Sequence, residues 1–207
     1  MRARALKIII YYSLFIIYSS AICAQTRIRD IYAATPDSIF PLLTKNNRLD
    51  QIDFRENNMQ AVVKNKFDEH SELLVLTDKY LKLQLSKHCV VEMRLLSDST
   101  LASPSDTDLR FCMVETYNAP ASDSRIRFFD AAWNELSQTI DCPEVDDFLS
   151  EDVDLDTRLA LQALPLVKAS LSEKDNSITF SLQTSELTKG QKQKLEGKVH
   201  EISYSLP

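Results

Sequence analysis

The sequence predicts an α+β fold, in which N-terminal helices pack on an antiparallel β-meander that is followed by a small β-β-α-β unit. Three observations predict it. Apolar residues recur at helical spacing within residues 28–54, and they alternate with polar residues at a period of two within residues 81–86. A strongly acidic run at residues 144–156 then separates these elements from a second set of short apolar segments.

Three short helices are predicted before residue 60. The first includes Ile28–Tyr32, whose apolar side chains fall on one helical face. Thr35 followed by Pro36 is typical of a second helix start, with the threonine as N-cap and the proline at the first helical position. Asn47, with Asp50 three residues later, indicates the capped start of a third helix.

The meander is predicted by alternation and by short apolar runs between turn residues. Leu81, Leu83 and Leu85 alternate with polar residues, as in a strand with one buried face. Trp133 is expected to cover an edge or an end of the sheet. Because the connections between these runs are short, we expect neighbouring strands to be antiparallel. The predicted strands are residues 73–76, 81–86, 90–96, 109–116 and 126–129.

The C-terminal third predicts a hairpin, a polar helix and a last strand. These elements are residues 164–171 and 178–182 for the hairpin, 187–198 for the helix and 199–206 for the strand. The chain is therefore divided into a signal (1–24), helices plus sheet (25–142), an acidic connection (143–157) and the β-β-α-β unit (158–207). The last unit could also be continuous with residues 25–142, and the sequence leaves open whether they share one sheet.

Residues 1–24 are typical of a secretory signal peptide. A basic start, a short apolar segment (residues 8–17) and small residues in SSAICAQ (residues 19–25) follow in the expected order. The apolar stretch is shorter than the about 20 residues that a membrane anchor needs. We predict cleavage near Ala24. Lipid anchoring at Cys23 and retention of the segment as an anchor are the minor alternatives.

Charge narrows the range of partners. Removing the signal removes its three cationic residues, so the formal net charge falls from −6 to −9. Such an acidic surface repels phosphate backbones and anionic membrane surfaces, so we expect no nucleic-acid partner. We also expect no transmembrane segment in the mature chain.

Glycine is almost absent, and this excludes several enzyme classes. The chain has 2 glycines, Gly190 and Gly197. Phosphate-binding loops, dinucleotide fingerprints and the nucleophile elbow of α/β-hydrolases need glycine where backbone approaches a ligand or takes a positive φ. None of these motifs is present.

Three cysteines remain after the signal: Cys89, Cys112 and Cys142. Since the number is odd, at least one thiol is unpaired within the chain. Cys89 and Cys112 lie on consecutive predicted strands and could form a cross-strand disulfide if the register placed them opposite each other. The alternative is that both are buried, inert thiols.

No metal or cofactor is predicted. The three histidines, His70, His88 and His200, lack zinc-ligand spacing. The Asp-x-Asp-x-Asp run at residues 152–156 matches the start of an EF-hand loop, but threonine and alanine stand where the turn glycine and the bidentate glutamate belong.

A polar cluster around the third predicted helix is the candidate binding site. Lys45, Arg48 and Asp53 could line a small surface for an anion or a peptide. The alternative is that these residues only cap helix ends and form local ion pairs.

Three segments resemble a known family. They are PDSIFPLLTKNNRLDQIDF (36–54), LTDKYLKLQLS (76–86) and ASDSRIRFFDAAW (121–133). Together they are similar to a family of small exported proteins from Bacteroidota that is described only as a domain of unknown function. The resemblance implies a periplasmic or outer-surface location and brings no catalytic residues.

The same resemblance suggests a modification. Bacteroidota O-glycosylate the pattern Asp-Ser/Thr-apolar, which Ser38 follows in Asp-Ser-Ile and Ser99 follows loosely in Asp-Ser-Thr. Ser99, in a polar segment, is the better candidate.

The leading functional hypothesis is a non-catalytic periplasmic or secreted protein that binds a protein, a peptide or an envelope component. It would use a sheet face, a sheet edge or an exposed apolar patch. The alternative is a small-molecule-binding or hydrolytic domain with a pocket between helices and sheet, and a structural component of the envelope is a third class. The sequence does not predict an enzyme.

Overall fold

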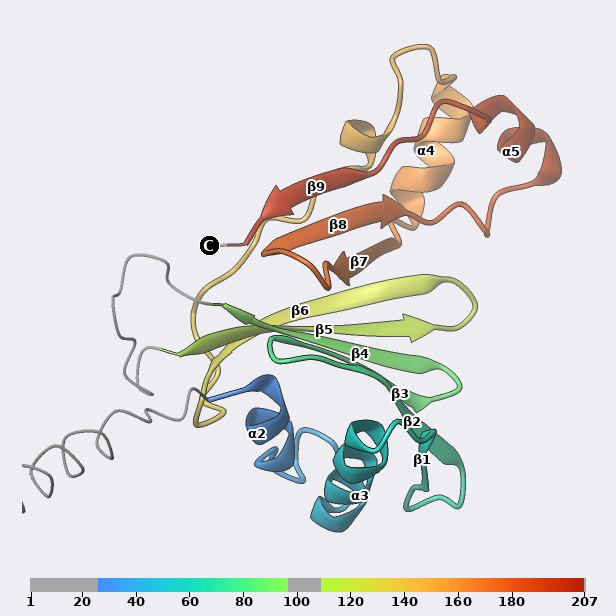
Figure 1. Cartoon of the computed structure of the whole chain (residues 1–207). Coiled ribbons are helices and arrows are strands. Elements are labelled where there is room, and N and C mark those ends of the chain that lie inside the picture. The colour runs from blue at the N-terminus through green and yellow to red at the C-terminus, as the bar shows by residue number, and fades with distance from the viewer. Residues whose placement is uncertain (1–25, 97–108, 207) are drawn as a thin grey trace, which may run out of the picture.

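The computed structural model describes residues 26–96 and 109–206 and confirms the α+β fold (Figure 1). The helices α2 (Ile28–Ala33) and α3 (Lys45–Glu56) come first. The next six strands are β1 (Ala61–Lys64), β2 (His70–Leu76), β3 (Tyr80–Ser86), β4 (Cys89–Leu96), β5 (Arg110–Asn118) and β6 (Ser122–Asp130). The C-terminal elements are the 3₁₀ helix η2 (Val145–Phe148), α4 (Leu155–Ala163), β7 (Val167–Leu171), β8 (Ser177–Leu182), α5 (Lys189–Leu195) and β9 (Ile202–Ser205).

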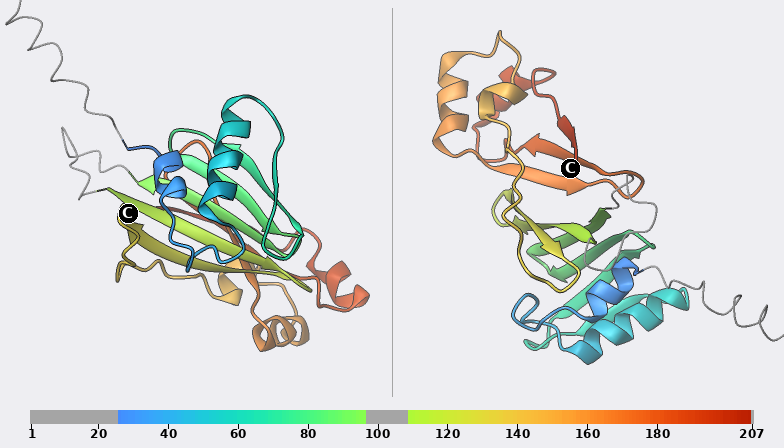
Figure 2. Two further views of the ribbon diagram at one scale, coloured as in Figure 1. Left: turned by 90° about the horizontal axis from the view of Figure 1, so that it is seen from below. Right: turned by 90° about the vertical axis from the view of Figure 1, so that its left-hand side faces the viewer.

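The strands form two separate sheets. β1 to β6 make one antiparallel meander in sequence order, and β7, β8 and β9 make a second sheet of three strands. α2 and α3 cover one face of the meander, and the second sheet lies over its other face (Figures 1 and 2). This arrangement answers the question that the sequence left open, because the two parts pack together without sharing a sheet.

The N-terminal helices differ from prediction in one place. No helix begins at Pro36; the chain makes turns there, and the Thr35 hydroxyl donates to the carbonyl of Tyr32 at the end of α2. α3 does exist, but its N-cap is Thr44, whose hydroxyl accepts from the amide of Asn47 at 3.1 Å. The Asn47 side chain accepts in turn from the amide of Thr44, which closes a capping box one turn earlier than predicted.

The meander confirms the predicted alternation. Leu81, Leu83 and Leu85 of β3 are buried in the core beneath the helices, while Lys82 and Gln84 point to the other face. All five predicted strands are present. The first strand, β1, was not predicted because its four residues are too few for a periodic pattern to emerge.

An aromatic cluster closes the core on the helix side. Trp133 lies at the end of β6, with its ring centroid 4.8 Å from that of Phe111 and 5.3 Å from that of Phe129. Its indole N–H donates to the carbonyl of Ile31 at 3.1 Å and so ties α2 to the sheet. Trp133 thus covers the end of the sheet, as predicted.

On the opposite face, side chains of the meander bind the edge of β7. The β7 amides of Ala169 and Leu171 donate to Ser124 Oγ at 2.9 Å and to Glu92 Oε2 at 2.8 Å. Arg94 donates to the carbonyl of Glu173, in the turn after β7, at 2.8 Å. Because a strand edge buried without partners would be costly, these contacts fix where the second sheet docks.

The C-terminal part adds a helix that was not predicted. Asp154 caps α4 by accepting from the amide of Thr157 at 3.2 Å. The predicted acidic connection at 143–157 therefore contains η2 and the start of α4. The strand predicted at 164–171 begins only at Val167. The polar helix and the last strand lie within their predicted ranges, and β8 begins at Ser177, one residue before the predicted start of the second hairpin strand.

Several predictions concern residues outside the described ones: the signal at 1–24, cleavage near Ala24, the lipid anchor at Cys23 and the modification of Ser99. Within residues 26–96 and 109–206, no helix combines the length and the apolar character that a membrane span requires.

Candidate functional site

The predicted cluster of Lys45, Arg48 and Asp53 does not converge. The Arg48 side chain is only 2% exposed, and it donates to Asp37 at 3.1 Å and to the carbonyl of Thr35 at 2.5 Å. It holds the turns before α3 in place, so the prediction that it faces a ligand is wrong.

The other two residues of the cluster are exposed but far apart. Lys45 and Asp53 are eight positions apart on α3, which corresponds to about 12 Å along a helix. The Asp53 carboxylate accepts from Asn57 Nδ2 at 3.2 Å near the C-terminus of α3. The structure therefore favours the alternative of helix-end contacts and local ion pairs.

The structure also corrects the prediction of a disulfide between Cys89 and Cys112. Cys89 and Cys112 are free and buried, and the exposed Cys142 is free as well. In the register of β4 and β5, Cys89 is opposite Tyr117 and Cys112 is opposite Arg94. The two thiols face different cores on opposite sides of the meander, so they cannot form a disulfide.

Burial keeps both of these thiols protonated. Desolvation, with a smaller contribution from the nearby Glu115 carboxylate, raises the pKa of Cys89 to about 11. Desolvation alone raises the pKa of Cys112 to about 12. Since the thiolate is the reactive form, both behave as the inert residues of the alternative prediction.

Ser38 is exposed, in the turns before α3. Its neighbour Asp37 is the ion-pair partner of Arg48, which holds this segment against the helix. The hydroxyl is accessible to a modifying enzyme, and its O-glycosylation stays a prediction.

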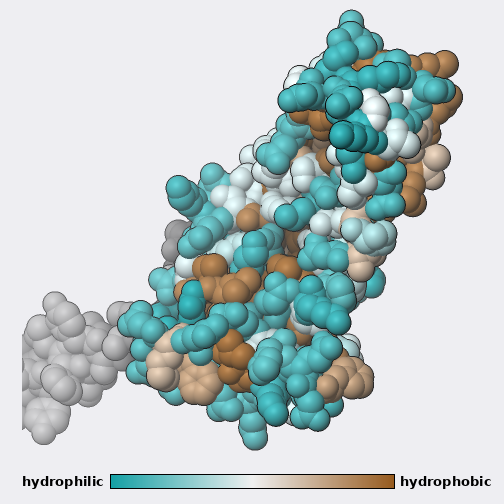
Figure 3. Space-filling view, turned by 90° about the vertical axis from the view of Figure 1, so that its right-hand side faces the viewer, coloured by the Kyte–Doolittle hydropathy of each residue, from teal (hydrophilic) through white to brown (hydrophobic). Residues whose placement is uncertain are grey.

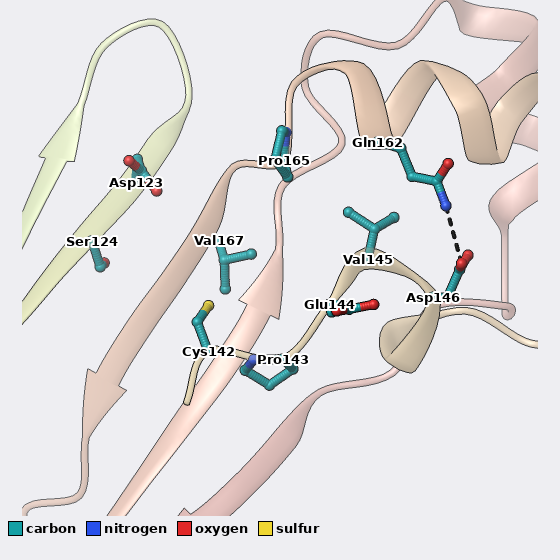
Figure 4. A pocket seen from close by; sticks show the side chains of 10 residues that line it. All are labelled: Asp123, Ser124, Cys142, Pro143, Glu144, Val145, Asp146, Gln162, Pro165 and Val167. Atoms are coloured by element: carbon teal, nitrogen blue, oxygen red, sulfur yellow. Dashed lines mark hydrogen bonds between the residues drawn. The ribbon is translucent and has the colours of Figure 1, made fainter. Parts of the chain in front are cut away.

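A cleft lies where β6, the acidic connection and α4 meet (Figure 4). We call it the junction cleft. It has a volume of about 470 Å³, within the range of small-ligand sites, and is open to solvent. Its lining is Asp123, Ser124, Cys142, Pro143, Glu144, Val145, Asp146, Gln162, Pro165 and Val167.

The junction cleft is acidic. Asp146 is bound by Arg158 at 2.7 Å and by Gln162 at 3.0 Å, the latter contact being visible in Figure 4. Asp123 and Glu144 have no ion pair with any residue that the structure describes. None of the lining residues is a histidine, a lysine or an arginine, so the cleft presents carboxylates without a neutralising cation of its own.

The two potential nucleophiles of the cleft are not activated. Ser124 Oγ accepts from the amide of Ala169 and is 2.9 Å from the hydroxyl of Thr116, so it serves the docking of β7. Burial, together with the charge of Asp123, raises the pKa of the Cys142 thiol. A raised pKa disfavours the thiolate, and the site is therefore better suited to binding than to nucleophilic catalysis.

Beside the cleft, α4 presents two leucines to solvent. Leu155 is 70% exposed and Leu159, one helical turn later, is 53% exposed. We call these two residues the leucine ridge. Leu164, also 53% exposed, follows the end of α4 and does not share this face. The opposite side of the same helix is buried through Thr157 and Leu161. Figure 3 shows apolar residues, in brown, gathered along one margin of the C-terminal part.

The leucine ridge is what sequence reasoning missed. The segment LDTRLALQAL (155–164) has leucines at positions 155 and 159 that share one helical face, and Leu161 on another. No helix is predicted for this segment, because residues 155–157 belong to the predicted acidic connection and the next predicted element is the strand that begins at residue 164. The cap formed by Asp154 was the signal that could have identified a helix.

Comparison with known families gives a clear match. Residues 20–205 match the family described as "Protein of unknown function (DUF3256)". The chain belongs to this family. This agrees with the resemblance seen in the sequence as far as a family of unknown function is concerned.

The fold is similar to that of a solved structure. It is described as the structure of a domain of an uncharacterized protein from Porphyromonas gingivalis W83. The two are 22% identical with a TM-score of 0.68, and the match covers 86% of this chain and 92% of the other. This DUF3256 protein therefore has a structural relative in the Bacteroidota. No curated protein matches it at a significant level.

Proposed function

We propose that this DUF3256 protein is a non-catalytic binding protein of the bacterial envelope, periplasmic or secreted, and that the leucine ridge is its docking face. The observation that carries the proposal is the exposure of Leu155 and Leu159 on one side of α4. A helix that is apolar on both sides is expected to be covered on both sides, and here one side faces solvent.

The location is supported by the N-terminal sequence. The order of charge, apolar segment and small residues in residues 1–25 is typical of exported proteins. The structural relative from Porphyromonas gingivalis is consistent with a host that has a periplasm. Mass-spectrometric sequencing of protein purified from the envelope of its native host should find a chain that begins near Gln25. A chain that still begins with Met1 would contradict the location.

Capture of partners from the native envelope tests the docking face. Tagged wild-type protein should recover a partner that the double variant Leu155→Ser/Leu159→Ser does not recover. Phe67→Ser is the matched control, because Phe67 is a 75% exposed apolar residue in the turn between β1 and β2, far from α4. Equal recovery with the wild type and the leucine variant would contradict the proposal.

A small-molecule carrier is the second candidate, favoured by the volume and the carboxylates of the junction cleft. This cleft lies between β6 and the C-terminal part, not between the N-terminal helices and the sheet. A cationic ligand would suit it, because Asp123 and Glu144 are not neutralised by described neighbours. Native mass spectrometry of protein from its host would reveal such a ligand, and Asp123→Asn/Glu144→Gln should abolish its retention.

A further inference from the structure

The spacing of the leucine ridge matches the face of another helix. Leu155 and Leu159 are one helical turn apart on α4. Side chains spaced in this way form a ridge that packs into the groove between side chains of a second helix. A partner helix with apolar residues at positions i and i+4 would cover both leucines.

The surroundings of the ridge determine the charge of that partner. Residues 141–164 contain eight carboxylates and one cation, Arg158. Three of these carboxylates have cationic partners within the chain: Asp146 with Arg158, Asp152 with Lys198, and Asp154 with Lys194. The other five have no ion pair among the described residues; they are Asp141, Glu144, Asp147, Glu151 and Asp156.

One of these carboxylates is on α4 itself, and another is beside its end. Asp156 is exposed in the first turn, next to Leu155. Towards the other end of α4, Gln162 lines the junction cleft together with the carboxylate of Glu144. An apolar helix that carried acidic flanks would be repelled at both ends, whereas basic flanks would be attracted.

We propose that the leucine ridge docks a cationic amphipathic helix of a partner protein. The apolar stripe of that helix covers Leu155 and Leu159, and its lysines or arginines lie against Asp156 and the carboxylates of the junction cleft. This inference rests on the proposed function and adds to it the chemical class of the partner. Complementary charge sets the orientation of the helix and speeds its association, and burial of the leucines supplies affinity.

A synthetic peptide tests this chemistry directly. The probe is a 14-residue helix-forming peptide with leucines along one face and lysines on the flanks, titrated by calorimetry into the protein purified from its native host. A second peptide has every lysine replaced by glutamate. We expect the lysine peptide to bind at least tenfold more tightly than the glutamate peptide, with an affinity that falls as salt is added.

Variants place the binding on the ridge. Leu159→Ser should lower the affinity for the lysine peptide at least tenfold, and Asp156→Asn should lower it about threefold. Phe67→Ser should leave this affinity unchanged. Because Leu159 is 53% exposed, its replacement leaves the core intact, which a thermal melt would verify.

Each other result would overturn the inference. Equal binding to the wild type and to Leu159→Ser would mean general attraction to an acidic protein. Self-association, or adsorption to zwitterionic lipid vesicles, that is lost in Leu159→Ser would assign the ridge to a second copy or to a lipid surface.

The proposed function is tested separately. If the envelope partner depends on the ridge but the lysine peptide does not bind, the function holds and the cationic partner class is wrong. If the peptide binds at the ridge but no envelope partner depends on the ridge, the proposed function is wrong. Peptide binding then reflects the surface chemistry alone, and the inference of a cationic partner helix is wrong as well.

Discussion

The two faces of the six-stranded sheet are covered in different ways. On the helix side, α2 and α3 pack aliphatic and aromatic side chains on the strands, as around Phe111 and Trp133. On the other side, Glu92, Arg94 and Ser124 reach out of the sheet and hydrogen-bond the backbone at the edge of β7. The first kind of contact depends on shape and apolar area, and the second depends on a few directional bonds.

The largest effect is expected on the helix side. Phe111→Ala removes a fully buried ring that contacts both Phe129 and Trp133, so it should lower the free energy of unfolding by about 3–5 kcal/mol. Urea denaturation measures this change. Phe67→Ala, at an exposed site, should change it by less than about 0.5 kcal/mol. A similar cost at both sites would mean that the aromatic cluster is not part of the core.

The second largest loss of stability is expected on the face of the meander that binds the second sheet. Glu92→Ala removes the acceptor of the Leu171 amide and of Lys82 at 2.9 Å, so we expect a loss of about 3 kcal/mol. Amide hydrogen exchange should accelerate at Ala169 and Leu171 more than within α3.

Glu72→Ala is the matched control for this prediction. Glu72 is a half-buried glutamate of β2 that accepts from the side chain of Gln60, away from the second sheet. Glu72→Ala should leave the hydrogen exchange of the β7 amides unchanged, and it should alter the free energy of unfolding by less than about 0.5 kcal/mol. If Glu92→Ala leaves the exchange of Leu171 unaltered, the two faces do not differ as described.

A smaller effect concerns the residues predicted to bind a ligand. Arg48→Met leaves the carbonyls of Thr35 and Leu43 without their buried donor, and it should cost about 2 kcal/mol in urea denaturation. Lys45→Ala, on the exposed side of the same helix, should be neutral within about 0.5 kcal/mol. Equal, small effects would restore Arg48 as a candidate for ligand binding.

The smallest expected effect is the loss of stability at high pH that is due to the buried thiols of Cys89 and Cys112. The folded-state pKa values of Cys89 and Cys112, about 11 and about 12, lie above the ordinary value of 9.0, so the folded state holds these protons more tightly than the unfolded chain. Stability from each thiol is complete below pH 9 and is lost as the pH rises towards the folded value. At pH 10 each thiol should account for about 1 kcal/mol of the loss.

Two measurements check the thiols. The decrease in unfolding free energy between pH 8 and pH 10 should be smaller in Cys112→Ala than in the wild type. At pH 8 a thiol reagent should modify only the exposed Cys142 in the folded protein, and it should reach Cys89 and Cys112 after unfolding. Rapid labelling of all three would contradict their burial.

The sequence predicts the sheet of this molecule better than its candidate site. Alternation in β3 reports burial directly, because Leu81, Leu83 and Leu85 must share a face whatever they pack against. Arg48 shows the limit of such reasoning, since its burial arises from turns eleven and thirteen residues earlier in the chain. Glu92 and Leu171 are 79 positions apart, and no local sequence pattern predicts their contact.

The leucine ridge was beyond prediction for a related reason. Local sequence gives the amphipathic character of a helix, but which of two apolar sides becomes buried is decided by the tertiary structure. In α4 the side with Leu161 faces the core and the side with Leu159 does not. The same ten residues would be equally compatible with the opposite choice.

Ser124 and Glu92 take the place that a neighbouring strand would occupy beside β7. A fragment that begins at residue 143 would carry all three strands of the second sheet, yet it would lack both of these acceptors. The unpaired backbone donors and acceptors along this edge of β7 would then be exposed and could pair with the same edge of another fragment. Proteolytic separation of the two parts should thus yield a C-terminal fragment that aggregates. In the intact chain, the meander prevents this by covering the edge of β7.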